Sequence, residues 1–203
     1  MTQIKDLNGI HVEGHIKISD PSTGEVIVNQ RNAIHYENMS LALAESLANQ
    51  GQGFIYEMSF GNGGTSVDPT GIITYLTPNS TGTNASLYNQ TFTKVVDELS
   101  VNNTDPIRNK TEIRHVSGTN YTDILVRCLL DYGEPDGQDA FDTAGNTDGI
   151  FVFDELGLRS YSAAGTGRLI THVIFHPVQK SLNRLVQVDY TVRIQSLSGI
   201  SGE

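Results

Sequence analysis

A strict alternation of apolar and polar residues in the last strand-like segment, "RLVQVDYTVRIQS", constrains the fold most. Its apolar positions are Val186, Val188, Tyr190, Val192 and Ile194. A period of two residues places successive side chains on opposite faces of a strand, so one face of this strand is predicted to be buried. A similar alternation in residues 10–19 is followed by "DPSTGE" and then "VIV". Asp, Pro and Gly favour a turn, so residues 10–29 are predicted to form a β-hairpin.

Further short strand-like segments follow along the chain, separated by Gly, Asn and Asp. They are "FIYEMSF", "TFTKVVDEL", "TEIRHVS", "YTDILVRCLLDY", "GIFVFDELGLRS" and "GRLITHVIFHPV". One segment differs, because Met39, Leu43 and Leu47 are four residues apart, which predicts a helix near residues 36–49 that packs on a sheet. Many short strands and one helix predict a mainly β fold, an antiparallel β-sandwich that is jelly-roll-like, as a single domain over residues 1–203.

Two long segments without strong periodicity, residues 61–90 and 134–149, are predicted to be interaction loops, since structureless loops of this length are uncommon unless they contact something. Aromatic side chains contribute much of the binding energy at protein interfaces. The candidate interface residues are Tyr75, Tyr88, Phe92 and Tyr132. For the anchors within residues 75–88, folding back onto the domain's own core is an open alternative. The C-terminal "SLSGISGE" is predicted to be a short flexible tail.

The charge of the chain argues against several classes of partner. The formal net charge is −10 and the sequence pI is about 4.9. Nucleic-acid binding requires clustered Lys and Arg, and here the basic residues are scattered, so neither nucleic acid nor an anionic membrane surface is expected as a partner. A single cysteine, Cys128, excludes an intrachain disulfide. The first residues lack the apolar segment of a signal peptide, so we expect synthesis in a cytoplasm.

The glycine-rich "FGNGGTSVDPTG", residues 60–71, raises the question of a phosphate-binding loop. Such a loop needs a helix directly after the glycines, and here Pro69 and Gly71 oppose one. No Gly-Lys-Ser/Thr follows, which excludes a Walker loop. We therefore predict a strand exit, with positive φ angles at Gly61, Gly63 and Gly64 and a turn after Asp68.

Candidate metal ligands are present without a specific spacing. The segment 134–149 carries several carboxylates, Glu134, Asp136, Asp139, Asp142 and Asp148. The order of ligands that defines an EF-hand is absent, so calcium binding there is an open alternative to a solvated loop. His11 and His15 share one strand face, as do His172 and His176, but the spacing of a zinc motif is missing. No metal or cofactor is predicted.

Nothing in the sequence indicates a catalytic centre. Cys128 lies in the apolar "ILVRCLL", where a thiol is predicted to be buried and inert. Asp154 and Glu155 are adjacent in a predicted strand, so their side chains are expected on opposite faces and not as a catalytic pair. No catalytic residue and no small-molecule substrate are predicted, and the chain is not expected to be an enzyme.

The order of the segments carries a resemblance to a known type of protein. "DPSTGEVIVNQRNAIHYENMSLALAESLAN", "IYEMSFGNGGTSVDPT", "FDELGLRS" and "GRLITHVIFHPVQKSLNRLVQVDYTVRIQ" follow one another from about Asp20 to Gln195. This layout resembles small virion structural proteins of tailed bacteriophages, especially the contractile-tailed ones. The resemblance implies a non-enzymatic building block of a virion, assembled in the host cytoplasm. Its expected partners are other virion proteins and copies of itself.

The resemblance leaves the position in the virion open. We expect the tail, baseplate or collar, with a capsid decoration protein as the alternative. A module that binds host glycans is a third possibility, but such sites stack sugars on aromatic residues, and this chain has no Trp and only 7% aromatic residues.

Overall fold

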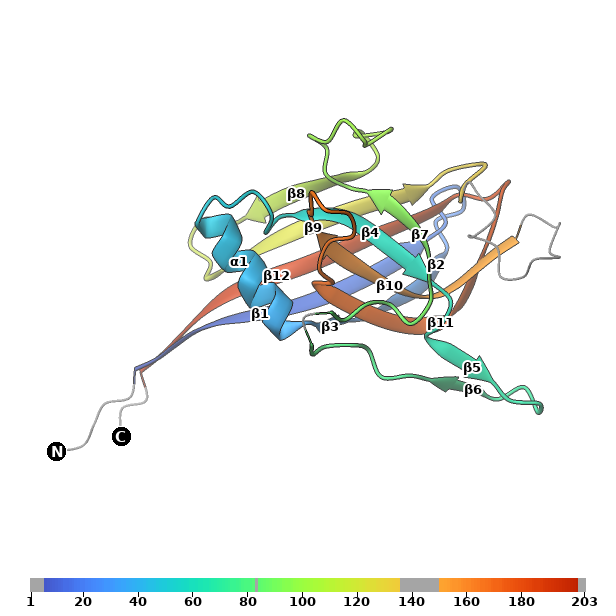
Figure 1. Cartoon of the computed structure of the whole chain (residues 1–203), viewed down its shortest axis with the longest axis horizontal. Coiled ribbons are helices and arrows are strands. Elements are labelled where there is room, and N and C mark those ends of the chain that lie inside the picture. Colours follow the sequence, from blue (N-terminus) through green and yellow to red (C-terminus); the bar gives the residue numbers. More distant parts are fainter. Residues whose placement is uncertain (1–5, 83, 136–149, 201–203) are drawn as a thin grey trace.

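The structure, a computed structural model, describes residues 6–82, 84–135 and 150–200. Two five-stranded antiparallel sheets pack face to face, which confirms the predicted β-sandwich (Figure 1). The first sheet has the order β2 (Val26–Arg31), β1 (Asp6–Ser19), β12 (Val186–Ile200), β9 (Tyr121–Leu130) and β8 (Lys110–His115). The second has the order β3 (Ala33–Ile34), β11 (Thr171–Ser181), β10 (Ile150–Ser160), β4 (Ile55–Gly61) and β7 (Gln90–Val95). A small hairpin of β5 (Thr65–Val67) and β6 (Ile73–Tyr75) and the helix α1 (Tyr36–Leu47) complete the fold.

The hairpin predicted for residues 10–29 is confirmed, and a second hairpin has a turn of similar composition. β1 pairs with β2 across the "DPSTGE" turn, and Ile18 lies opposite Val28. β8 pairs with β9 across residues 116–120, where Gly118 has a φ of +86°. Positive φ is the conformation that glycine adopts at little cost, so this position explains the turn.

The two ends of the described chain pair with each other. β1 and β12 are antiparallel neighbours over their whole lengths, from the pair Asp6–Ile200 to the pair Ser19–Gln187. The prediction of a flexible tail is therefore wrong for residues 196–200, which continue β12 as the ladder partner of the start of β1. Backbone pairing needs no apolar side chain, which is why the Ser- and Gly-rich sequence did not reveal it. Figure 1 shows both strands running together away from the body of the sandwich.

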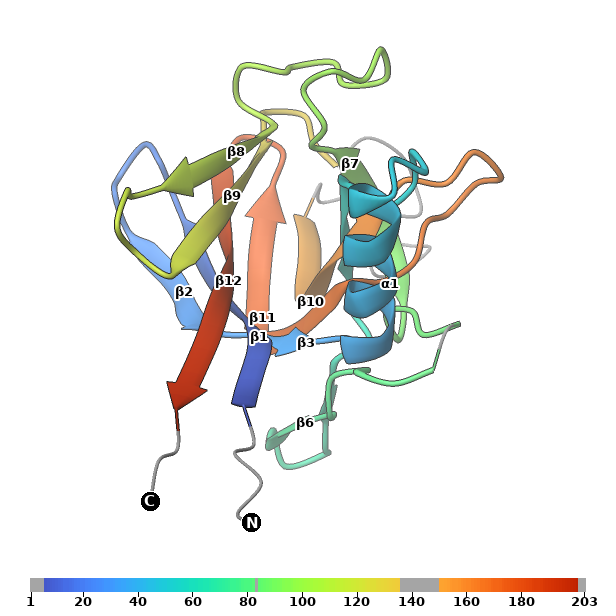
Figure 2. The same cartoon turned by 90° about the vertical axis from the view of Figure 1, so that its left-hand side faces the viewer.

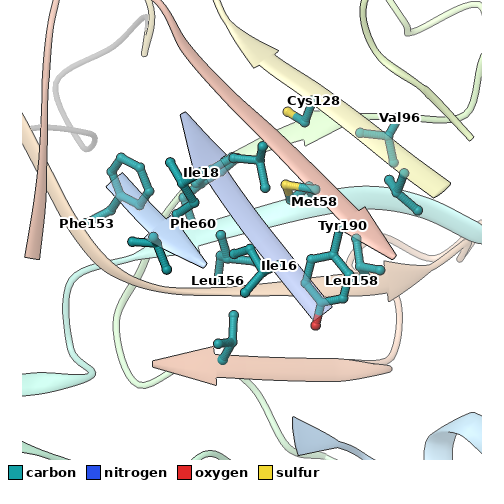
Figure 3. Close-up of a cluster of buried hydrophobic side chains, with 14 of the residues drawn as sticks. Ile16, Ile18, Met58, Phe60, Val96, Cys128, Phe153, Leu156, Leu158 and Tyr190 are labelled. Carbon is teal, nitrogen blue, oxygen red and sulfur yellow. The ribbon is translucent and has the colours of Figure 1, made fainter. Parts of the chain in front are cut away.

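The core lies between the two sheets. Alternating residues of β1 and β12, such as Ile16, Ile18 and Tyr190, point inwards and are fully buried. They meet Phe60 of β4 and Phe153 of β10, whose rings are 5.4 Å apart in an edge-to-face arrangement (Figure 3). The alternation predicted for the last strand is thus confirmed.

The helix α1 occupies the predicted place but buries a shorter stripe than expected. His35 caps its N-terminus, because the ring Nδ1 accepts a hydrogen bond from the backbone N–H of Asn38. Met39 and Ala42 are buried, whereas Leu47 is exposed, so the prediction that Leu47 packs on a sheet is wrong. No helix in the described part of the chain is long and apolar enough to span a membrane.

Cys128 is expected to be unreactive in the folded protein. It is fully buried in β9, and burial raises the pKa of its thiol to about 12. Because the thiolate is the reactive form, incubation with a thiol reagent at pH 8 should leave Cys128 unmodified in buffer and modify it completely in denaturant. Rapid modification in buffer would contradict the burial of this strand.

Candidate functional site

Two buried carboxylates on β10 hold the glycine-rich segment in place. Asp154 accepts hydrogen bonds from the backbone N–H of Gly64 at 2.9 Å and of Thr65 at 2.8 Å. Glu155 accepts a bond from the N–H of Gly63 at 3.1 Å through Oε1. The "DELGL" and "FGNGGT" segments, about 90 residues apart in the sequence, are therefore in direct contact.

Glu155 also holds the far end of the same long segment. Its Oε1 accepts a hydrogen bond from the N–H of Asn89 at 2.8 Å, and its Oε2 accepts one from the N–H of Tyr88 at 2.9 Å. One buried carboxylate thus ties both ends of residues 63–89 to β10. Hydrogen bonds to an ionised acceptor are about twice as strong as neutral ones, which suits this position.

Both carboxylates reach the same segment because β10 is irregular. The predicted separation of Asp154 and Glu155 on opposite faces holds for a regular strand. Here the pairing of β10 with β11 shifts register between Phe153 and Glu155. Such a bulge redirects side chains, so the expectation that the two carboxylates point to opposite faces is wrong: both reach residues 63–65.

The glycines of this segment serve a different purpose from the predicted one. Gly61, Gly63 and Gly64 do not have positive φ angles, and only Gly71 in residues 60–71 does, at +88°. A Cβ on Gly61 would lie 2.5 Å from Glu155 Oε1 and closer still to the carbonyl oxygen of Asn89. These positions therefore require glycine because the clamped groups approach the backbone closely.

This difference can be measured with two alanine substitutions. Gly61→Ala forces a methyl group against the Glu155 carboxylate and backbone, so it should lower the free energy of unfolding by about 1–3 kcal/mol or more. Gly71→Ala meets nothing within 4 Å but strains a positive φ, for a cost of about 1 kcal/mol. Chemical denaturation compares the two. An equal or larger loss for Gly71→Ala would contradict the close approach at Gly61.

His172 of β11 completes the environment of Glu155. Its Nδ1 accepts a hydrogen bond from the backbone N–H of Asn79 at 2.8 Å, so the ring proton is on Nε2. Nε2 lies 3.0 Å from Glu155 Oε2 and donates to it. Both side chains have a relative exposure of 0%. The imidazole thereby links residue 79 to the carboxylate.

The pKa of Glu155 reflects this environment. Burial by itself would raise the pKa of the carboxyl group, because it penalises the charged form. Hydrogen bonds from His172 and from the N–H groups of Asn89, Tyr88 and Gly63 outweigh burial and hold the pKa below its ordinary value. Glu155 is therefore a carboxylate in the folded protein at neutral pH.

Arg159, also on β10, binds residues near the C-terminal end of the same segment. It is buried, and its Nη2 donates to Ser86 Oγ at 2.7 Å and to Gln90 Oε1 at 2.7 Å. Its Nη1 donates to the carbonyl oxygen of Gly167 at 2.9 Å, and its Nε donates to Ser59 Oγ at 3.0 Å. Burial lowers the pKa of this guanidinium, and the charge of Glu57 opposes that effect.

We call Asp154, Glu155, Arg159 and His172 the buried clamp. His35 is a fifth buried residue that contacts the same segment, since its Nε2 lies 2.9 Å from the carbonyl oxygen of Gly82. A carboxylate beside an imidazole is also the pairing that orients a general base in many enzymes. In this protein both groups are shielded from solvent and bind the chain's own backbone, so the arrangement anchors the long segment near both of its ends and at residue 79.

The four predicted interface residues lie in different surroundings. Tyr75 and Tyr88 are exposed on the clamped segment, and Tyr132 is exposed after β9. Phe92 of β7 is half-buried and packs against Phe60, with ring centroids 6.1 Å apart. Leu87, on the same segment, is buried and folds back onto the domain.

The candidate metal ligands lie in different surroundings. His11 and His15 are exposed, and His172 is buried in the clamp while exposed His176 lies 3.2 Å from the Tyr75 hydroxyl. Among the residues that the structure describes, no group of three or more His, Cys, Asp or Glu side chains is placed to hold a metal. Of the predicted acidic loop, Glu134 forms an ion pair with Lys94, and its other carboxylates lie outside the described residues.

The sequence contained a signal for the clamp that the strand patterns obscured. Charged or imidazole side chains interrupt the apolar strands "FDELGLRS" and "LITHVIF" at Asp154, Glu155, Arg159 and His172. Buried polar groups need hydrogen-bond partners, so these positions predict a contact with another segment. They do not identify which segment.

Comparisons of the chain with protein-family models, with curated proteins and with solved structures found no match.

Proposed function

We propose that this protein is a non-enzymatic structural component of a tailed-bacteriophage virion, assembling through protein–protein contacts in the tail, baseplate or collar. The observation that carries the proposal is the buried clamp. The imidazole–carboxylate pair of His172 and Glu155 is fully buried, and Glu155 holds both ends of a long surface segment by hydrogen bonds. A pre-organised segment loses less entropy when it binds, which suits a building block.

The resemblance to virion proteins supports the same conclusion. Two of the phrases that carry it, "FGNGGT" and "DELGL", form the two sides of the clamp. They therefore describe one structural arrangement and not two unrelated loops. Exposed Tyr75, Leu76 and Tyr88 lie on the segment that this arrangement presents, and aromatic and aliphatic anchors of this kind are typical of protein interfaces.

The ends of β1 and β12 offer a second means of assembly. Within the described residues, β2 pairs with β1 only from His15 onwards, and β9 pairs with β12 only as far as Gln195. The start of β1 and the end of β12 therefore pair with each other, and the outer edge of each has no paired strand among those that the structure describes. Such edges add strands from other chains, which fits partners that are virion proteins or further copies of this chain.

Cryo-electron microscopy of particles of the phage that encodes this chain tests the proposal. We expect density for the sandwich at symmetric positions in the tail, baseplate or collar, with neighbouring chains against residues 61–90. Density on the outer surface of the shell would replace this assignment with capsid decoration. Absence of the chain from purified particles, checked by mass spectrometry, would overturn the proposal.

A further inference from the structure

An apolar groove opens between α1 and the first sheet, away from the buried clamp. It has a volume of about 670 Å³. Residues of α1, β9 and β12 line it. Figure 2 shows where these elements lie relative to one another. Residues of β8 and the segment 97–99 that follows β7 also line it. Ile124, Val192 and Ile194 of the first sheet line the groove together with Met39, Ala42 and Leu43 of α1.

The rim of the groove is apolar and exposed. Leu99 is 87% exposed and Ile113 is 76% exposed, and Phe54, another lining residue, is also exposed. Below them, Ile124 and Ile194 are half-buried and Val192 is fully buried. Apolar surface therefore continues from the floor over the rim, and contiguous surface of this kind marks sites of interaction.

The charges at the groove have one sign. Among the residues that line it, the ionisable ones are Asp97 and Glu98, and none is basic. Each carboxylate accepts one local bond, from the N–H of Leu99 to Asp97 and from the N–H of Thr111 to Glu98. A carboxylate can accept more than one hydrogen bond, so both have capacity for a cationic donor.

These features discriminate between the possible occupants. A small apolar molecule would cover the floor and leave Leu99 and Ile113 in water. A second copy of this chain would bring a further net charge of −10 towards the acidic rim. A basic amphipathic segment of another protein would cover both floor and rim and would neutralise Asp97 and Glu98.

We propose that the groove binds an amphipathic segment of a partner protein, with apolar side chains on the floor and a Lys or Arg against Asp97 and Glu98. Helices bind grooves in this manner through apolar residues at positions i, i+3, i+4 and i+7. This contact goes beyond the proposed place in a virion, because it is a property of the isolated chain.

Fluorescence anisotropy with the purified full chain tests the proposal. The probe is a labelled helical peptide of leucine and lysine, about 14 residues long with that apolar spacing. A peptide with glutamate in place of every lysine is the matched control. We expect the lysine peptide to bind and the glutamate peptide to bind at least about tenfold more weakly.

Variants locate the binding. Leu99→Ser and Ile113→Thr leave the net charge unchanged and alter exposed side chains, so each should preserve the melting temperature. Each should lower the affinity for the lysine peptide by about tenfold. The double substitution Asp97→Asn and Glu98→Gln should lower the affinity for the lysine peptide by a similar factor. Ile107→Ser, which removes an exposed apolar side chain outside the groove, should have no effect.

Three outcomes would overturn the proposal. The first is an affinity for the lysine peptide that Leu99→Ser and Ile113→Thr leave unchanged, which indicates non-specific electrostatic attraction to an acidic protein. The second is tight binding of dodecylammonium with no competition from the peptide, which indicates a small amphiphile. The third is a dimer in light scattering that Leu99→Ser dissociates, which indicates a second copy. None of these results bears on whether the chain is present in virions, so the two proposals fail separately.

Discussion

Glu155→Ala is expected to lower the free energy of unfolding by about 3–5 kcal/mol. The substitution removes the acceptor for the backbone N–H groups of Gly63, Tyr88 and Asn89. It also leaves the Nε2–H of His172 without its partner in a site shielded from solvent. Buried donors without acceptors carry their full desolvation cost, so the loss should exceed that of an ordinary hydrogen bond.

Chemical denaturation and amide hydrogen exchange check this result. In Glu155→Ala, exchange should accelerate first at Gly63, Tyr88 and Asn89, because these amides lose their acceptor. The matched control is Glu25→Ala, which removes a largely exposed carboxylate 3.4 Å from Arg184 and should change stability by less than about 0.5 kcal/mol. A Glu155→Ala protein as stable as the control would show that the clamp contributes nothing.

Arg159→Ala should be the next most damaging change, with a loss of about 2–4 kcal/mol. The buried guanidinium joins Gln90 and Ser86 on the long segment to Ser59 on β4 and to Gly167. Alanine would leave a cavity and several unpaired acceptors. Part of this cost is offset, because the alanine variant no longer has to bury a charged guanidinium, the desolvation cost of which lowers the pKa of Arg159.

The control for Arg159 is another arginine of the same chain. Arg114 is exposed and pairs with Glu112 at 3.3 Å, so Arg114→Ala should change the free energy of unfolding by less than about 0.5 kcal/mol. Limited proteolysis adds a local measurement, since Arg159→Ala should speed cleavage near Ser86 and Gln90. If the rate of cleavage there equals that in the unsubstituted protein, Arg159 does not anchor the segment.

Much of the fold could be predicted because its signals are local. The alternation around Tyr190 and the "DPSTGE" turn each depend on a few consecutive residues, and both features are present in the structure. The four-residue spacing beginning at Met39 likewise predicted α1. The same method placed Leu47 wrongly, because periodicity indicates which residues share a face and not how far the neighbouring sheet extends.

The candidate site was less accessible to sequence reasoning. Asp154 and Glu155 were separated by assuming a regular strand, but the bulge in β10 depends on its pairing with β11. The glycines were assigned positive φ angles, which is their commonest use in turns. The structure shows that Gly61 is needed for close packing against Glu155.

The main strands, the hairpin of residues 10–29 and the helix, and hence the mainly β class, follow from the amino-acid sequence. Three features emerge only in the folded chain: residues 196–200 join β12, Glu155 binds Tyr88 across 67 positions of the chain, and a groove opens beside α1. The difference lies in the range of the interactions. Alternation and turn preference act between near neighbours, whereas a ladder, a buried hydrogen bond or a groove requires segments that only folding brings together.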